Sequence, residues 1–427
     1  MKQTVCSRLR SDAQGKTLYL LSWLAYASAY IGRYNYSAVM GAITAENSLS
    51  LSAAGAVSTG YFICYAVGQI VFGLLSQSVS PYAMILLGLC GSGLCNLGAG
   101  AFPASFMGLL WGANGLFQAM IWPPIVRLFA ESMPLERQKH ACVSINSTTP
   151  AGTLAAYALS AVLLQFADWH HVFFSCGGLL LGMAAVFWLG TAPLRRETAY
   201  APQPEFQKQK GTGNGPAALL AAGLGAMLLP VLLHGGLKDG VTNWVPSMIQ
   251  SNFGISPAFS AAVAMALPLV NLSGAYLSGW LNEHCTHNEL KTAGFLFALA
   301  SVCLLALPLA MRTSLLLAVL LLAVTTASML GVNTMFINVI PVKAGRHGGA
   351  SMLSGTLNAV TYLGAAAATW GIGAAAEGCG WNAVFLLWLV MAVLALLGSA
   401  PLARRWGRYL KSREGGVFLR SIQGRHA

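Results

Sequence analysis

Twelve long apolar runs follow one another along this chain of 427 residues, and they restrict its fold more than any other feature. A helix needs about 20 apolar residues to cross a bilayer. Outside closed β-barrels, only a helix provides hydrogen bonds for all backbone N–H and C=O groups in the bilayer core. The sequence therefore predicts an all-α membrane protein with twelve transmembrane helices. The approximate limits of the runs are 17–41, 52–76, 81–101, 105–128, 140–166, 171–193, 216–250, 257–281, 291–311, 314–340, 348–375 and 382–403.

Composition agrees with this prediction. Hydrophobic residues make up 56% of the chain and charged residues only 8%, whereas a soluble domain carries about a quarter charged residues. The first 16 residues contain no apolar core, so a cleaved signal peptide is not expected. The nine cysteines show no CxxC or Cys/His spacing and are interpreted as packing residues rather than metal ligands or disulfides. No metal or other cofactor is expected.

The distribution of basic residues predicts the orientation. Lys and Arg concentrate in cytoplasmic loops of membrane proteins. Of the 24 such residues, 21 lie on one side of the twelve runs, Arg312 alone lies on the other side, and Arg33 and Lys238 lie inside runs. The net charge of +12 therefore reflects topology, and nucleic acid is not an expected partner. We expect a monomeric multi-pass protein of the inner or plasma membrane with both termini in the cytoplasm.

The longest polar stretch between runs divides the chain into two halves. It is rich in Pro, Gln, Lys and Gly, which is typical of a flexible linker. The predicted domains are an N-terminal six-helix bundle (1–194), a cytoplasmic linker (195–215), a C-terminal six-helix bundle (216–404) and a basic cytoplasmic tail (405–427).

An internal repeat indicates that the two halves are related. Arg33 in the first run has a counterpart 205 positions later, Lys238 in the seventh. Gly73-Leu-Leu-Ser76 recurs 206 positions later as Gly279-Trp-Leu-Asn282, and Trp169-His-His-Val-Phe173 recurs 212 positions later as Trp381-Asn-Ala-Val-Phe385. Each match is weak, but three in order at a nearly constant offset predict two pseudo-symmetric bundles.

The intramembrane charges are the candidate functional residues. A charge at the centre of a membrane helix costs about 2.5–3.5 kcal/mol on insertion scales and usually faces a polar interior. Arg33 and Lys238 face one acid, Asp239, which is the only acidic residue inside the twelve runs, and His234 lies four residues before Lys238. Because two basic groups outnumber the single acid, the sequence predicts an anion-binding site. Asp239 and His234 are possible titrating groups for proton coupling. A snorkelling Arg33, or a purely structural ion pair, remains the alternative.

Helix breakers and polar residues surround these charges. Gly235, Gly236, Gly240 and Pro246 would allow the seventh helix to bend, and Trp122-Pro123-Pro124 is expected to end the fourth sharply. Buried amides and hydroxyls suggest a wet interior, although each alone more often makes an interhelical hydrogen bond. They are Gln69, Asn114, Gln118, Asn146, Thr149, Asn271, Asn333, Asn338, Asn358, Thr361 and Tyr362. No P-loop, metal-ligand cluster or catalytic triad is present, so an enzyme is not expected.

These residues resemble the major facilitator superfamily, and within it the organophosphate/phosphate antiporters, which include glycerol-3-phosphate and hexose-phosphate transporters. The resemblance covers nearly the whole chain. The most specific pieces are Tyr30-Ile-Gly-Arg33-Tyr-Asn35, Asn114-Gly-Leu-Phe-Gln118-Ala-Met-Ile-Trp122-Pro123-Pro124, Glu136-Arg137, Lys238-Asp-Gly-Val-Thr-Asn-Trp244-Val-Pro246 and Gly380-Trp381-Asn.

The resemblance implies that Arg33 and Lys238 bind the phosphate moiety and that Tyr26, Tyr30 and Tyr65 line the site. Lys238 stands where glycerol-3-phosphate transporters usually have Arg. Gln69 replaces a lysine of those transporters and Thr149 replaces a histidine, while Ser76-Gln77-Ser78 replaces their charged loop motif. The candidate substrate-binding residues are thus Arg33, Lys238, Tyr26, Tyr30, Tyr65, Gln69, Thr149, Asn358 and Tyr362.

The expected function is secondary active transport of a small organic anion, either a phosphorylated or a carboxylated metabolite. Transport would proceed by alternating access, with phosphate exchange or proton coupling. Two alternatives stay open. One is a membrane sensor that binds a sugar phosphate without moving it. The other is a proton-coupled symporter or exporter of another solute.

Overall fold

The protein is described by a computed structural model covering residues 12–46, 48–75, 79–133, 141, 144–197, 225–344 and 350–423. Several predicted features lie outside these residues. They are Ser76–Ser78, Glu136-Arg137, positions 198–215 of the predicted linker, positions 216–224 of the seventh run, and the last residues of the chain.

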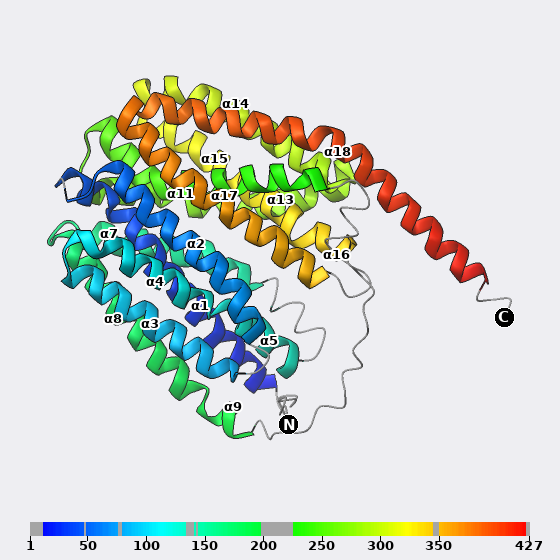
Figure 1. The fold of residues 1–427 in the computed structure, drawn as a ribbon, viewed down its shortest axis with the longest axis horizontal. Helices are drawn as coiled ribbons and strands as arrows, with labels where there is room; N and C mark the ends of the chain where they lie inside the picture. Colours follow the sequence, from blue (N-terminus) through cyan, green and yellow to red (C-terminus); the bar gives the residue numbers. More distant parts are fainter. Residues whose placement is uncertain are drawn as a thin grey trace.

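The described residues are almost entirely helical (Figure 1). The helices of the first half are α1 (Asp12–Ala45), α2 (Leu51–Leu75), α3 (Pro81–Ala101), η1 (Ala104–Phe106), α4 (Met107–Ala119), α5 (Trp122–Ser132), η2 (Ile145–Ser147), α7 (Thr148–Leu163), α8 (Trp169–Gly190) and α9 (Ala192–Glu197). Those of the second half are η3 (Gly225–Met227), α11 (Leu228–Phe253), α12 (Pro257–Ala264), α13 (Ala266–Leu281), η4 (Asn282–Thr286), α14 (Glu289–Thr313), α15 (Leu315–Asn333), η5 (Thr334–Val339), α16 (Ile340–Ala344), α17 (Ala350–Cys379) and α18 (Trp381–Gln423).

The helices follow the twelve predicted runs. Within the described residues, 8 helical spans are long and apolar enough to cross a membrane. The four remaining runs fall in α1, α4–α5, α7 and α11. Helices α4 and α7 have only 13 and 16 residues, and α1 and α11 contain the charged residues of the candidate site. The count of twelve is therefore confirmed for eight spans and stays a prediction for the other four.

The outer surface of the helices suits a lipid environment. Large apolar side chains are exposed on α3, α8, α14 and α15, for example Leu94, Leu189, Leu305 and Leu316 at 61–70% relative exposure. Soluble monomers rarely expose apolar patches of this extent. The protein is thus a multi-pass membrane protein whose apolar side chains face outward as well as inward.

Two helix ends differ from the simplest expectation. Helix α4 ends at Ala119, just before Trp122-Pro123-Pro124, but the helical path resumes at once, because α5 begins at Trp122 and continues to Ser132. Proline lacks an N–H group and is tolerated in a first helical turn, so the motif interrupts the helix and restarts it. The last helix extends beyond its apolar run (382–403), because α18 continues into the basic segment as far as Gln423.

The two halves repeat the same packing scheme. In the first half α1 packs on α7 and α8, α2 on α4, and α3 on α4 and α8. In the second half α11 packs on α17 and α18, α13 on α15, and α14 on α15 and α18. Each contact of one set has its counterpart in the other when the helices are matched in order. This agreement confirms two pseudo-symmetric bundles, with α1 and α11 as equivalent helices.

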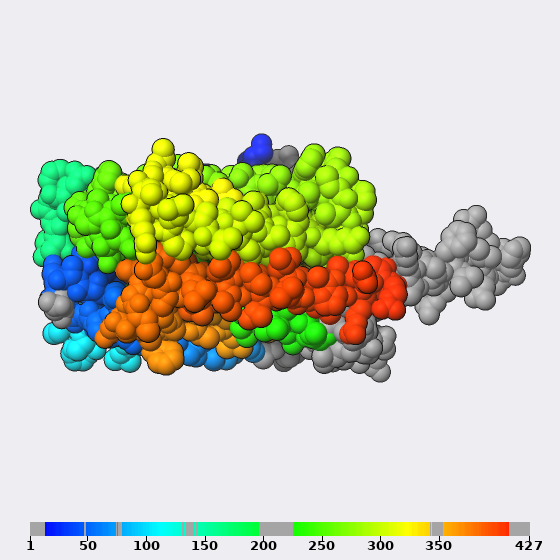
Figure 2. All heavy atoms as spheres, turned by 90° about the horizontal axis from the view of Figure 1, so that it is seen from above, coloured from blue at the N-terminus to red at the C-terminus, as the bar shows by residue number. Residues whose placement is uncertain are grey.

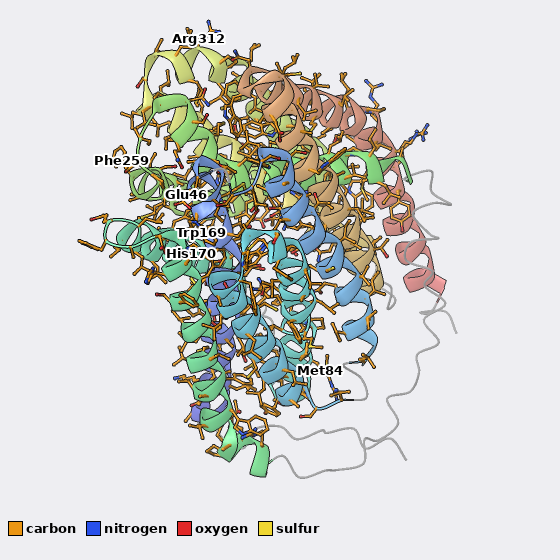
Figure 3. The ribbon with its side chains drawn as sticks, turned by 60° about the vertical axis from the view of Figure 1, so that its left-hand side comes forward. Glu46, Met84, Trp169, His170, Phe259 and Arg312 are labelled. Atoms are coloured by element: carbon orange, nitrogen blue, oxygen red, sulfur yellow. The ribbon has the colours of Figure 1, made fainter. Side chains whose placement is uncertain are left out.

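The halves meet closely at one end of the molecule, which we call the distal end because α1 begins and α18 finishes at the other (Figure 1). Glu46, Trp169, Phe259 and Arg312 lie toward the distal end, whereas Met84 lies toward the opposite one (Figure 3). In the space-filling view, segments of the two halves lie against each other at the left, which is the distal end (Figure 2). The contacts between halves involve α2 with α17, α1 with α11, and α7 with α12 and α13.

Hydrogen bonds across this junction lie on the distal side of Arg33. Ser37 of α1 donates to the carbonyl of Asn243 of α11 at 2.7 Å, and Gln250 Nε2 donates to the carbonyl of Gly41 at 3.3 Å. Thr59 of α2 donates to the carbonyl of Ala366 of α17 at 2.6 Å. These bonds join the halves and close the distal side of the molecule.

A buried carboxylate joins four helical elements at the opposite end of the second half. Glu289, the first residue of α14, has no exposed surface. It accepts hydrogen bonds from Lys343 of α16, Trp406 Nε1 of α18 at 2.6 Å and Asn282 of η4 at 3.2 Å. A carboxylate at a helix N-terminus is also favoured by the helix dipole.

We expect Glu289→Ala to lower the apparent melting temperature of the purified protein. The indole N–H of buried Trp406 would lose its acceptor, at a cost of about 1–3 kcal/mol. Thermal unfolding in detergent measures the shift. Glu283→Ala, which removes an exposed acid of the neighbouring element η4, is the matched control. Equal melting temperatures for both variants would contradict a stabilising role for Glu289.

Candidate functional site

Three charged residues from the two halves meet near the middle of the molecule and form what we call the ion-pair cluster. Arg33 of α1 and Asp239 of α11 are 7% and 2% exposed, and Lys238 is 21% exposed. Arg33 Nη2 lies 3.6 Å from Asp239 Oδ1, and Lys238 Nζ lies 3.4 Å from Asp239 Oδ2. The Tyr34 hydroxyl donates to Asp239 Oδ1 at 3.4 Å. One carboxylate therefore contacts both cations.

Six aromatic rings surround Arg33, and we call them the aromatic cage. They are Tyr30, Tyr34, Tyr61, Phe62, Tyr65 and Tyr362, with ring centroids between 5.1 and 5.9 Å from the Arg33 guanidinium carbon. Lys238 Nζ lies 5.7 Å from the Tyr362 ring. Ring faces attract cations at such distances, which compensates part of the lost hydration of a buried guanidinium.

Three members of the aromatic cage are absent from the predicted substrate-binding residues: Tyr34, Tyr61 and Phe62. A spacing signal was available for two of them. Tyr34 follows Tyr30 by four residues, and Tyr61 precedes Tyr65 by four, which places each pair on one helix face. The two pairs stack at 6.2 and 5.9 Å. Phe62 carries no such signal, because a phenylalanine in an apolar helix looks like an ordinary packing residue.

Buried amides hold the α1 backbone in the turn before Arg33. Asn96 and Asn114 donate to the Gly32 carbonyl at 3.2 and 3.0 Å, and Gln118 donates to the Ala29 carbonyl at 2.9 Å. Tyr61 donates to Gln118 Oε1 at 2.8 Å, which links the amides to the aromatic cage. Asn114 and Gln118 thus make the interhelical hydrogen bonds expected of such residues, and they position Arg33.

The remaining predicted substrate-binding residues differ in their distance from the cluster. Tyr30 donates to the Tyr26 hydroxyl at 3.2 Å, and its own hydroxyl interacts with Thr149 of α7. Gln69 donates to the carbonyl of Ala119 of α4 at 3.5 Å, which is a weak bond. Asn358 is partly buried on α17, with no contact to the cluster recorded among the described residues. Tyr26 and Thr149 are therefore linked to the aromatic cage through Tyr30, whereas among the described residues Gln69 and Asn358 show no contact with the ion-pair cluster.

His234 points away from the ion-pair cluster. Its Nε2 lies 3.0 Å from the carbonyl oxygen of Met329 of α15, and its ring packs edge-on against Phe336. A carbonyl only accepts, so Nε2 carries a proton in this arrangement. Within the part of the chain that the structure describes, Nδ1 has no hydrogen-bond partner and is buried. The ring therefore fits its neutral form.

Two small cavities adjoin Arg33. One is lined by Tyr26, Ala29, Tyr30, Arg33, Tyr65 and Gln118, and lies toward the end opposite the distal end. The other is lined by Arg33, Tyr36, Ser58, Tyr61, Phe62, Trp111 and Asn243. Each has room for about one water molecule. An organic anion that contacts the Arg33 guanidinium would therefore require the lining side chains to move apart.

The described residues hold no group of three or more His, Cys, Asp or Glu side chains that could bind a metal ion. The polar groups that converge on the cavities are a guanidinium, an ammonium, one carboxylate, phenols and amides. Guanidinium and ammonium groups bind carboxylates and phosphates by charge-assisted hydrogen bonds. The arrangement can therefore bind an anion.

Comparison with known proteins agrees with the fold. A family model described as the Major Facilitator Superfamily matches residues 22–369. A glycerol-3-phosphate transporter of Bacillus subtilis (strain 168) is 22% identical over 295 residues, which cover 64% of this chain and 66% of the transporter. The membrane sensor protein UhpC of Salmonella typhimurium is also 22% identical, over 65% of this chain and 66% of the sensor.

A solved structure supports the fold. A bacterial homologue of the human lysosomal transporter Spinster superposes with a TM-score of 0.78 over 93% of this chain and 98% of its own, at 15% identity.

Proposed function

Because this chain belongs to the Major Facilitator Superfamily, we propose that it carries a small organic anion across the cell membrane by alternating access. Arg33 and Lys238 are the proposed ligands of the anionic group. Tyr26, Tyr30, Tyr65, Thr149 and Tyr362 line the site in this proposal, with Gln69 and Asn358 at its edge. The family and the relatives are transporters, apart from the named sensor, and not enzymes.

The observation that carries the proposal is the meeting of Arg33 and Lys238 on one carboxylate. The two cations come from equivalent helices of the two bundles, α1 and α11. Buried unpaired charge is costly in a membrane interior, so two cations against Asp239 alone leave a deficit of one negative charge. An anion bound between the bundles would supply it.

The position of the cluster suits alternating access. Arg33 and Asp239 lie between helices of different halves, and the hydrogen bonds on their distal side close that route. Transport would require these bonds to break while the opposite side closes, as in transporters whose repeats rock around a central site. The excess of basic residues on the opposite side supports a cytoplasmic location for both termini.

Uptake into proteoliposomes tests the proposal. We expect the purified protein to accumulate at least one of glycerol 3-phosphate and glycerate when the vesicles are preloaded with phosphate or given a proton gradient. Lys238→Ala should reduce this uptake at least tenfold, because it removes one of the two cations that face the anion. Lys291→Ala, an exposed lysine at the start of α14, is the matched control. Wild-type uptake by Lys238→Ala would overturn the proposal.

A sensor is the second candidate, because one relative is named as a membrane sensor. A sensor would bind the anion at the ion-pair cluster without moving it. Protein that binds an anion, as judged by a higher melting temperature, but shows no uptake or exchange in sealed vesicles would favour this candidate.

A proton-coupled symporter or exporter that uses Asp239 and His234 is the remaining alternative. Asp239 is in the cluster, whereas His234 packs on α15. Loss of proton dependence in both Asp239→Asn and His234→Ala would favour that alternative, while unchanged uptake in both would exclude it.

A further inference from the structure

We propose that Asp239 selects the charge of the substrate, so that the site prefers an organic anion with one negative charge over a phosphate monoester with two. The inference rests on the proposed function, because it concerns the same site. The inference is based on the side chains that contact Asp239 and on the sum of their charges.

Asp239 is buried within the site and is not exposed to solvent beside it. Its side chain is 2% exposed and contacts Arg33 from one bundle and Lys238 from its own. Tyr34 of α1 donates to Oδ1. Within the described residues, Oδ2 is buried and has no hydrogen-bond partner, so its recorded polar neighbour is the Lys238 ammonium at 3.4 Å.

The charge of the cluster can be summed from these contacts. Arg33 and Lys238 contribute two positive charges and Asp239 one negative charge. The phenols of the aromatic cage are neutral, and His234 makes the hydrogen bond of a neutral ring to Met329. Other described acids, such as Glu46, Glu289 and Glu377, lie near helix ends. The cluster thus carries one net positive charge.

One singly charged anion neutralises this cluster. Lys238 can keep Asp239, its neighbour in sequence, while the Arg33 guanidinium turns to a carboxylate or a phosphodiester with its parallel N–H groups. A doubly charged phosphate would leave one uncompensated negative charge beside the Asp239 carboxylate. Like charges and unpaired charges are strongly disfavoured in a poorly hydrated interior. The buried Asp239 therefore discriminates against dianions.

Two methyl esters of phosphate differ in charge while sharing the same phosphate group, so they show the effect of charge alone. Dimethyl phosphate has one negative charge, and methyl phosphate has two at pH 8, because the second pKa of a phosphate monoester is about 6. Lactate tests whether a carboxylate serves as well as a phosphodiester. We expect the wild type at pH 8 to bind dimethyl phosphate or lactate at least tenfold more tightly than methyl phosphate, as measured by calorimetric titration of the full chain in detergent.

Asp239→Asn should change this preference, because the cluster would then carry two net positive charges. We expect the ratio of methyl phosphate to dimethyl phosphate affinity to rise at least tenfold. Asp239→Glu keeps the charge and should keep the wild-type preference. Glu283→Gln removes an exposed acid of η4 and is the matched control.

A pH series on the wild type gives the same test without a substitution, should Asp239→Asn fail to fold. At pH 5 methyl phosphate is mostly a monoanion. Its affinity should rise at least tenfold relative to that of dimethyl phosphate between pH 8 and pH 5. An unchanged ratio would overturn the inference.

The outcomes distinguish the inference from the proposed function. Tighter binding of methyl phosphate by the wild type at pH 8, or an unchanged preference in Asp239→Asn, overturns the inference. If Arg33→Ala and Lys238→Ala no longer bind the anion that the wild type binds, the proposed anion site stands. Binding that survives both of these substitutions, or no binding of any of the three anions, overturns the proposed function itself.

Discussion

Replacing Arg33 by alanine should reduce anion uptake to background. Arg33 is the cation that the aromatic cage surrounds, and it contacts the other half of the molecule through Asp239. Removing one member of a buried charged pair costs about 2–5 kcal/mol, and each 1.4 kcal/mol is about a tenfold change in affinity. Uptake of the accumulated anion into proteoliposomes, at a concentration below saturation, measures the loss.

Two further variants show what Arg33 supplies. Arg33→Lys keeps the charge but loses the planar pair of N–H groups, so we expect intermediate uptake. Arg312→Ala removes an exposed arginine at the distal end and should transport like the wild type. If Arg33→Ala elutes as a monodisperse protein and still transports at the wild-type rate, the role of Arg33 as an anion ligand is wrong.

A disulfide between α2 and α17 should stop transport reversibly. The hydroxyl oxygens of Thr59 and Thr369 lie 3.1 Å apart across the junction between the halves. Cysteine sulfurs at both positions would be close enough to react under mild oxidation. The bridge would hold the distal side closed, so we expect uptake by T59C/T369C to fall to background after oxidation and to recover after reduction.

The single variants T59C and T369C are the controls, because native cysteines such as Cys64 on α2 are also present. Neither should respond to the oxidant. Mass spectrometry of the digested protein would establish the new bridge. Full transport by a chain shown to be cross-linked would mean that α2 and α17 need not separate at this point.

The repeat in the sequence predicted which charged residues meet between the two halves. It matched Arg33 with Lys238, and the structure brings both onto Asp239. The prediction succeeded because an intramembrane charge is rare and costly, so three such residues are informative even without an alignment. Their role as substrate ligands stays a prediction.

The surroundings of these charges were harder to predict. Helix spacing places His234 within about 40° of Lys238 around the helix axis, yet its side chain reaches α15 instead of the cluster. Phe62 could not be told from a packing residue, and the two prolines after Trp122 restart a helix that they were expected to end. In each case the outcome depends on the neighbouring helix, which a pattern along one helix does not contain.

The close approach of α11 and α17 bears on how transport is coupled. A side chain at Gly235 would collide with the backbone of Thr361, and one at Gly364 with the backbone of Leu232. The backbones of the two helices are thus in close contact. In the proposed transport cycle, Lys238 and Asp239 would move with α11 and α17, and Arg33 would move with the other half. Return of the empty carrier would then require Arg33 to separate from Asp239, whereas in the loaded carrier the anion would already occupy Arg33. We therefore expect a higher barrier for the return of the unloaded protein, so that exchange of one anion for another is faster than net transport.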